Sequence, residues 1–169
     1  IQSARIDSGE AENWLDAYPS DLPPKNILRM FADRMAEADD QGKIRILSNL
    51  SRKYGKLLFP AISKYINHPS WEVRAAVCRS LTYLRHKKAI PHLKDAAKDP
   101  DWVVRSNAVR ALAKMGVEGE RALFDLLLSD DNYARDAART VLEQQGYLDR
   151  YRELLESGNP QKVHQALNK

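Results

Sequence analysis

The chain has 169 residues, 43% hydrophobic and 30% charged, which suits one domain or a short repeat array and excludes a disordered tail and a membrane-embedded protein. No apolar run is long enough to span a bilayer, and the single cysteine, Cys78, excludes an internal disulfide and a zinc site built from several cysteines. The net charge of +4 combines −5 over residues 1–40, +12 over residues 41–115 and −3 over residues 116–169, so the middle is basic and both ends are acidic.

The first predicted unit is a helical hairpin over residues 8–37, with helices at 8–18 and 24–37. Residues spaced three or four apart lie on one face of a helix, and this spacing guides the prediction. The apolar residues that mark the two helices are Trp14 and Leu15 in the first and Leu28, Phe31 and Met35 in the second. We interpret this hairpin as a degenerate first copy of the units that follow it.

Four further hairpins are predicted, over residues 40–67, 70–98, 101–128 and 131–157. Their helices are expected at 40–54, 57–67, 71–84, 89–98, 102–115, 120–128, 133–145 and 148–157. The clearest pattern is one apolar stripe at i, i+4, i+8 and i+11, formed by Val73, Val77, Leu81 and Leu84. A helix that begins near Pro160 predicts a partial sixth repeat or a cap over residues 159–169.

Residues typical of helix boundaries occur between these elements. We expect N-caps, whose side-chain oxygens accept from free N–H groups, at Asp40, Ser70, Asp101 and Asn132. Pro60 and Pro91 fall in the first turn of second helices, where a missing N–H is tolerated. Glycines expected to end first helices are Gly55, Gly116 and Gly146.

The hairpins repeat with a period of 30–31 residues. The string H-P-S-W-E-V-R at 68–74 realigns with D-P-D-W-V-V-R at 99–105, and a third copy gives Arg135, Ala138 and Leu142 at 30 residues after Arg105, Ala108 and Leu112. A hairpin of short helices cannot bury both apolar faces alone, whereas stacked hairpins share one core. The sequence therefore predicts an all-α fold, a right-handed α-solenoid of about five stacked hairpins that forms a single domain over residues 1–169.

Residues 99–116, D-P-D-W-V-V-R-x-x-A-x-x-A-L-x-x-M-G, resemble the HEAT repeat, in the short bacterial form called the phycobilisome-lyase-type repeat. The resemblance covers residues 40–157 well and the first hairpin poorly. It implies a ladder between neighbouring repeats, in which a turn acid meets the arginine of the following helix. The matching pairs are Asp99 with Arg105 and Asp130 with Arg135, whereas His68 replaces the acid before Arg74.

Arg74, Arg105 and Arg135 therefore have two interpretations, a structural ladder or a row of carboxylate or phosphate binders, and their recurrence with the repeat favours the ladder. Trp71, Trp102 and Tyr133 begin three consecutive first helices. We expect these rings to be mostly buried against the preceding hairpin, the alternative being a stacking surface for nucleic-acid bases.

The sequence gives no support for catalysis. It contains neither a Gly-rich phosphate loop nor a Gly-x-Ser-x-Gly elbow, and Cys78 aligns with core positions. No two of the four histidines, which are His68, His86, His92 and His164, have the spacing of metal ligands in one helix. We expect no enzyme activity, no cofactor and no metal site.

The basic middle is the feature that the fold does not require. Its candidate partner-binding residues are Lys56, Lys64, Lys87, Lys88, Lys94 and Lys98, in second helices and the turn before one of them. Second helices of such arrays usually line the concave surface, and a basic concave surface attracts acidic partners. The leading hypothesis is thus a non-catalytic scaffold that binds another protein or an acidic peptide.

Three alternatives remain open. Residues 41–115 could bind nucleic acid through phosphate contacts. The lyase-type resemblance implies a role in chromophore attachment to, or removal from, a light-harvesting protein. The charge asymmetry permits weak head-to-tail self-association. Since the chain starts at Ile1 rather than methionine, we expect a fragment or a processed product. The expected location is the cytoplasm, or the cytoplasmic face of a membrane if the missing N-terminus is an anchor.

Overall fold

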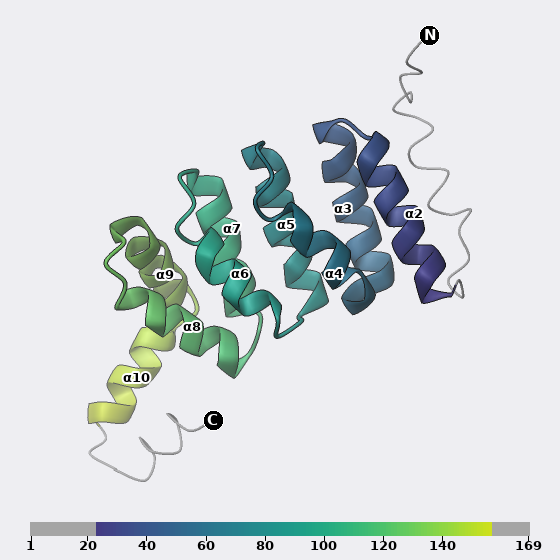
Figure 1. Ribbon diagram of the computed structural model, residues 1–169. Helices are drawn as coiled ribbons and strands as arrows, with labels where there is room; N and C mark the ends of the chain where they lie inside the picture. Colours follow the sequence, from purple (N-terminus) through teal and green to yellow (C-terminus); the bar gives the residue numbers. More distant parts are fainter. Residues whose placement is uncertain (1–22, 157–169) are drawn as a thin grey trace.

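The structure is a computed structural model that describes residues 23–156, and every regular element in these residues is helical (Figure 1). The predicted helix 8–18, His164 and the predicted partial repeat 159–169 lie outside the described residues. In chain order the helices are α2 (Pro24–Glu37), α3 (Asp40–Tyr54), η1 (Gly55–Leu58), α4 (Phe59–Ile62), η2 (Ser63–Tyr65), α5 (Trp71–Leu84), α6 (Ala89–Ala96), α7 (Trp102–Ala113), α8 (Val117–Leu127), α9 (Asn132–Gln144) and α10 (Tyr147–Glu156).

The helices form two layers of a stacked array. The first helices of successive hairpins, α3, α5, α7 and α9, pack directly on one another. The second layer contains α4, α6 and α8, and α6 contacts α8 of the next hairpin (Figure 1). The described part of the chain is an all-α solenoid, as the repeat predicts.

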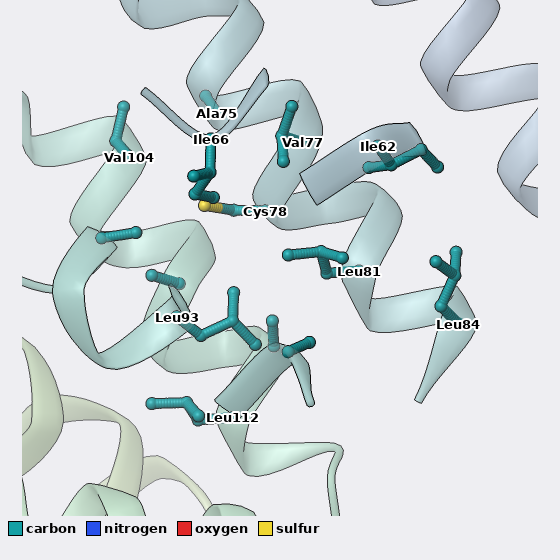
Figure 2. Close-up of a cluster of buried hydrophobic side chains, with 14 of the residues drawn as sticks. Ile62, Ile66, Ala75, Val77, Cys78, Leu81, Leu84, Leu93, Val104 and Leu112 are labelled. Atoms are coloured by element: carbon teal, nitrogen blue, oxygen red, sulfur yellow. The ribbon is translucent and has the colours of Figure 1, made fainter. Parts of the chain in front are cut away.

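One apolar core runs through the stack. The predicted stripe of α5, formed by Val73, Val77, Leu81 and Leu84, is fully buried. Figure 2 shows Val77, Leu81 and Leu84 of this stripe gathered with Ile62 from α4, Leu93 from α6 and Leu112 from α7. Each hairpin therefore contributes to a core that it could not close alone.

Cys78 is part of this core. Its side chain is completely buried, and burial raises the pKa of its thiol to about 12. The thiol stays protonated at neutral pH, so Cys78 acts as a small apolar residue rather than as a nucleophile.

The second helix of the hairpin 40–67 differs from the prediction of one helix over 57–67. It consists of a single α-helical turn, α4, between the 3₁₀ turns η1 and η2. Pro60, the second residue of α4, has no N–H to donate to the Lys56 carbonyl, and the Phe59 N–H binds that carbonyl instead in the tighter 3₁₀ pattern.

The start of α8 is also earlier than predicted, at Val117 rather than residue 120. Gly116 adopts φ +68°, which turns the chain directly out of α7 into α8. Gly119 then lies so close to the end of α7 that a Cβ there would stand 2.0 Å from the Leu112 carbonyl oxygen. Because Gly119 has no Cβ, α8 can pass this close to α7 and begin at Val117.

The N-caps agree with the prediction in one of four cases. Asp101 accepts from the Val103 N–H (2.8 Å), as expected. Two caps lie one residue earlier than predicted: Asp39 accepts from the Gly42 N–H (2.7 Å) and Asp131 from the Ala134 N–H (2.9 Å). Ser70 has the N-cap position, but its hydroxyl donates to Glu72 (2.6 Å).

The prediction that Trp71, Trp102 and Tyr133 are mostly buried is wrong for Trp102 and Tyr133, whereas somewhat more than half of Trp71 is covered. Their exposed fractions are 41%, 69% and 67%. Trp71 and Trp102 stand two residues before the buried Val73 and Val104, which is about half a helical turn, and so they point away from the core. The first layer consequently presents aromatic rings to solvent.

Candidate functional site

The six predicted partner-binding lysines all lie in the second layer or beside it. Lys56 is in η1, Lys64 in η2 and Lys94 in α6. The others are in the turn between α5 and α6 or directly after α6, and these are Lys87, Lys88 and Lys98. All six are exposed except Lys94, which is partly buried.

Two of these lysines are engaged by acids of the next repeat. Lys87 pairs with Glu118 (2.6 Å), and Lys94 pairs with Asp125 (2.8 Å), so both bind α8 at a distance of one repeat along the chain. Exposed pairs of this kind contribute under about 1 kcal/mol. Within residues 23–156, no carboxylate lies at ion-pair distance from the other four, which are Lys56, Lys64, Lys88 and Lys98.

The inter-repeat ladder joins different residues from those that the resemblance implied. Arg74 binds Asp99 of the next repeat through two parallel bonds, Nε–Oδ2 (2.7 Å) and Nη2–Oδ1 (2.9 Å). Its Nη1 donates to the carbonyls of His68 and Pro69. The acid comes from the repeat that follows the arginine, so the presence of His68 in the preceding turn does not prevent this contact. The Asp99 carboxylate thus pairs with Arg74 and not, as the resemblance implied, with Arg105.

Asp99 is held in its charged form by this arrangement. Its burial alone would raise the carboxyl pKa, but hydrogen bonds from Arg74 and from the Asp101 N–H, together with the positive charges of Arg74 and Arg105, lower that pKa below its ordinary value of 3.8. Both partners are well covered, with 14% of the Arg74 side chain and 10% of the Asp99 side chain exposed. Ion pairs this sheltered are weakly screened by salt.

We therefore expect acid to remove the stabilising effect of Asp99. A carboxyl whose pKa is lowered by folding stabilises the fold above its unfolded-state pKa, and this stability is lost as the pH falls through the folded-state value, below 3.8. Asp99→Asn should be less stable than the wild type at neutral pH, and the difference should shrink in acid. Urea melts from about pH 7 to about pH 3 measure this, and a difference that does not change with pH would contradict it.

Arg105 repeats half of the Arg74 arrangement. Its Nη1 donates to the carbonyls of Asp99 and Pro100, both at 2.8 Å, as Arg74 does one repeat earlier. At the position of Asp99, however, the next repeat has Ser129. This correspondence between Ser129 and Asp99 is supported by an equivalent hydrogen bond in each repeat. The Asp131 N–H donates to Ser129 Oγ (3.2 Å), as the Asp101 N–H donates to Asp99 Oδ1 (2.9 Å). A hydroxyl thus stands where the ladder needs a carboxylate.

Asp130, which the resemblance assigned to the ladder, lies one position beyond Ser129. It is exposed, and among the described residues no ion pair joins it to Arg105 or Arg135. Arg135 instead donates to the Ser129 carbonyl (2.8 Å) and to the Asn132 side chain. The Nε and Nη2 groups of Arg105 have no hydrogen-bond acceptor within residues 23–156.

Arg105 lines a groove of about 260 Å³ between α7 and α9. Its guanidinium lies over the ring of Tyr133, 4.7 Å from the ring centre. Trp102, three residues before Arg105 in α7, lines the same groove. The remaining lining residues are Ser106, Val109, Arg110, Asp136, Ala137, Thr140, Val141 and Gln144. We call this the α7–α9 groove.

Sequence reasoning did not find the α7–α9 groove. A signal was present, because alignment on the arginines gives a spacing of 30 rather than 31 residues for the last repeat and places Ser129 opposite Asp99. The alignment on acids placed Asp130 there instead. Exposure of Trp102 and Tyr133 depends on their position relative to the core stripe, which the repeat alignment alone did not use.

The three histidines within the described residues, His68, His86 and His92, belong to no cluster of metal-binding side chains. His86 stacks on Phe59 (4.4 Å between ring centres), and His92 is tilted against the same ring. In residues 23–156 no group of three or more His, Cys, Asp or Glu side chains is arranged to hold a metal ion. Nor is any helix in that part of the chain both long enough and apolar enough to cross a membrane.

Comparison with known families adds one finding. A family model for HEAT repeats matches residues 59–143, which is half of the chain and runs from α4 into α9. The match concerns HEAT repeats in general, so the short bacterial lyase-type form stays a prediction. Among curated proteins, none matches this sequence.

Proposed function

This chain belongs to the HEAT-repeat family, and we propose on that basis that it is a non-catalytic scaffold that binds another protein through the second layer of helices. Stacked hairpins present an extended surface of many side chains, which suits docking of a protein better than capture of a small molecule. The partner face is acidic in this proposal, and the second layer is the concave side.

Four lysines carry the proposal. Lys56, Lys64, Lys88 and Lys98 are exposed, and no acid within the described residues neutralises them. Their neighbours Lys87 and Lys94 already bind α8, so these two are less able to meet a partner. Unpaired surface charges raise the association rate with an oppositely charged partner more than they raise affinity at contact.

The test is charge reversal on this surface. Changing Lys56, Lys64, Lys88 and Lys98 to glutamate should strongly reduce binding of an end-blocked polyglutamate peptide, mainly through the association rate, while each change alters stability by no more than about 0.5 kcal/mol. A matched control changes the same number of exposed cations elsewhere, Arg45, Arg79, Lys114 and Arg139. It gives the same net charge and should bind nearly as the wild type does.

Two results would overturn the proposal. Equal losses in both variants would mean that only net charge matters. Tighter binding of duplex DNA than of the peptide, falling steeply with salt, would favour nucleic-acid binding instead. Sedimentation at several protein concentrations, run beside these titrations, measures head-to-tail self-association.

A further inference from the structure

We propose that the α7–α9 groove binds a carboxylate side chain, aspartate or glutamate, in an extended segment of a partner protein. The carboxylate would occupy the Nε–Nη2 edge of Arg105, with an apolar neighbour in the segment packed on Trp102. This inference rests on the scaffold function only in that its occupant is a protein, because it uses the first layer of helices and none of the four unpaired lysines.

The chain itself shows how a carboxylate binds at this position. Arg74 and Arg105 are equivalent residues, and each anchors its Nη1 on two backbone carbonyls of its own turn. In Arg74 the remaining edge binds Asp99 through two parallel bonds. In Arg105 the same edge faces a repeat whose corresponding residue is Ser129. Arg105, which lines the groove, therefore carries a half-completed carboxylate site.

The Arg105 guanidinium is held in place before any ligand arrives. Its Nη1 bonds fix one end, and the Tyr133 ring lies beneath it at 4.7 Å. A fixed arginine fork matches a carboxylate in two bonds and loses little side-chain freedom on binding. The same fork held loosely in solvent would bind much more weakly.

The walls of the groove favour a peptide over a nucleic acid. Trp102 and Tyr133 are 69% and 67% exposed, and both offer apolar surface in the groove that Arg105 lines. The lining has two cations, Arg105 and Arg110, and one anion, Asp136. The Asp136 carboxylate would repel a phosphate beside it, so the groove does not offer the continuous row of cations that suits a nucleic-acid backbone. A volume of about 260 Å³ suits one or two side chains of a longer segment.

The most informative variant places a carboxylate of the chain itself at the open edge of Arg105. Ser129→Asp installs a carboxylate at the position of Asp99, where it can bind the open edge of Arg105. It should raise the melting temperature and weaken binding of an end-blocked peptide, with one glutamate between two leucines, by about tenfold or more. Ser129→Asn is the matched control, since it keeps an acceptor for the Asp131 N–H without the charge, and it should change neither quantity appreciably.

A second pair of variants tests the aromatic wall. Trp102→Ala should weaken the same peptide without lowering the melting temperature, whereas Trp71→Ala, on the first layer but outside the groove, should leave binding unchanged. A peptide with glutamine in place of glutamate should bind at least about tenfold more weakly than the glutamate peptide.

The outcomes separate this inference from the scaffold proposal. If Ser129→Asp binds the glutamate peptide as the wild type does, or if the glutamine peptide binds equally well, the groove is not a carboxylate site. If the lysine-to-glutamate variant loses polyglutamate binding while the groove variants bind the glutamate peptide normally, the scaffold proposal stands and this inference fails. Preferential binding of duplex DNA that Ser129→Asp abolishes would assign the Arg105 edge to phosphate and also overturn it.

Discussion

Replacing Leu112 by alanine is expected to lower the free energy of unfolding by about 2–5 kcal/mol, and replacing Leu81 by alanine should cost a similar amount. Both side chains are completely buried, at the same position of successive first helices. Alanine removes apolar contacts that each leucine makes with the helices packed around it in the shared core. It leaves a cavity that those helices, held in place by their other contacts, can fill only in part.

Denaturant melts measure this effect. Leu128→Ala provides the control, because that side chain is 87% exposed and its loss should change stability by no more than about 0.5 kcal/mol. Losses below about half a kcal/mol at both Leu81 and Leu112 would show that the register of the stack is wrong.

Arg74→Ala is expected to cost about 3 kcal/mol of stability, and Arg105→Ala clearly less. Removal of Arg74 leaves the Asp99 carboxylate, whose side chain is only 10% exposed, without its main counter-charge. Removal of Arg105 frees two backbone carbonyls at 2.8 Å but leaves no unpaired acid behind. The two variants thus measure the difference between a closed and an open rung.

A double-mutant cycle sharpens the comparison. The Arg74 and Asp99 pair should show a coupling energy well above that of Arg105 and Asp130, which should be near zero. Equal losses for Arg74→Ala and Arg105→Ala, with equal couplings, would mean that Arg105 already has an internal carboxylate partner and that the groove has no open edge.

Sequence patterns predicted the helices of the described region well, because apolar spacing and boundary glycines act locally. Gly55, Gly116 and Gly146 all adopt positive φ where first helices end. The errors arise where tertiary contact overrides local pattern. Pro60 breaks a second helix into short turns, and Gly119 extends α8 because its missing side chain lets two helices approach.

The candidate site was only partly predictable for a related reason. The lysines were found from charge alone, but their division into paired and unpaired members depends on which acids α8 brings near Lys87 and Lys94. The ladder depends on a contact 25 residues along the chain, between Arg74 and Asp99, rather than on the acid nearest in sequence. A family pattern gives the residue types of such a ladder, whereas the three-dimensional register decides which rung is complete.

The most direct test of the open rung is the NMR response of the arginine side chains. During titration with the peptide that has one glutamate between two leucines, the Nε–H resonance of Arg105 should shift, because that group gains a charged acceptor. The Nε–H of Arg74, already bonded to Asp99 at 2.7 Å, should not move, and it serves as the control within the same molecule. A titration in which Arg105 stays fixed while only lysine resonances respond, or in which both arginines shift alike, would contradict the account.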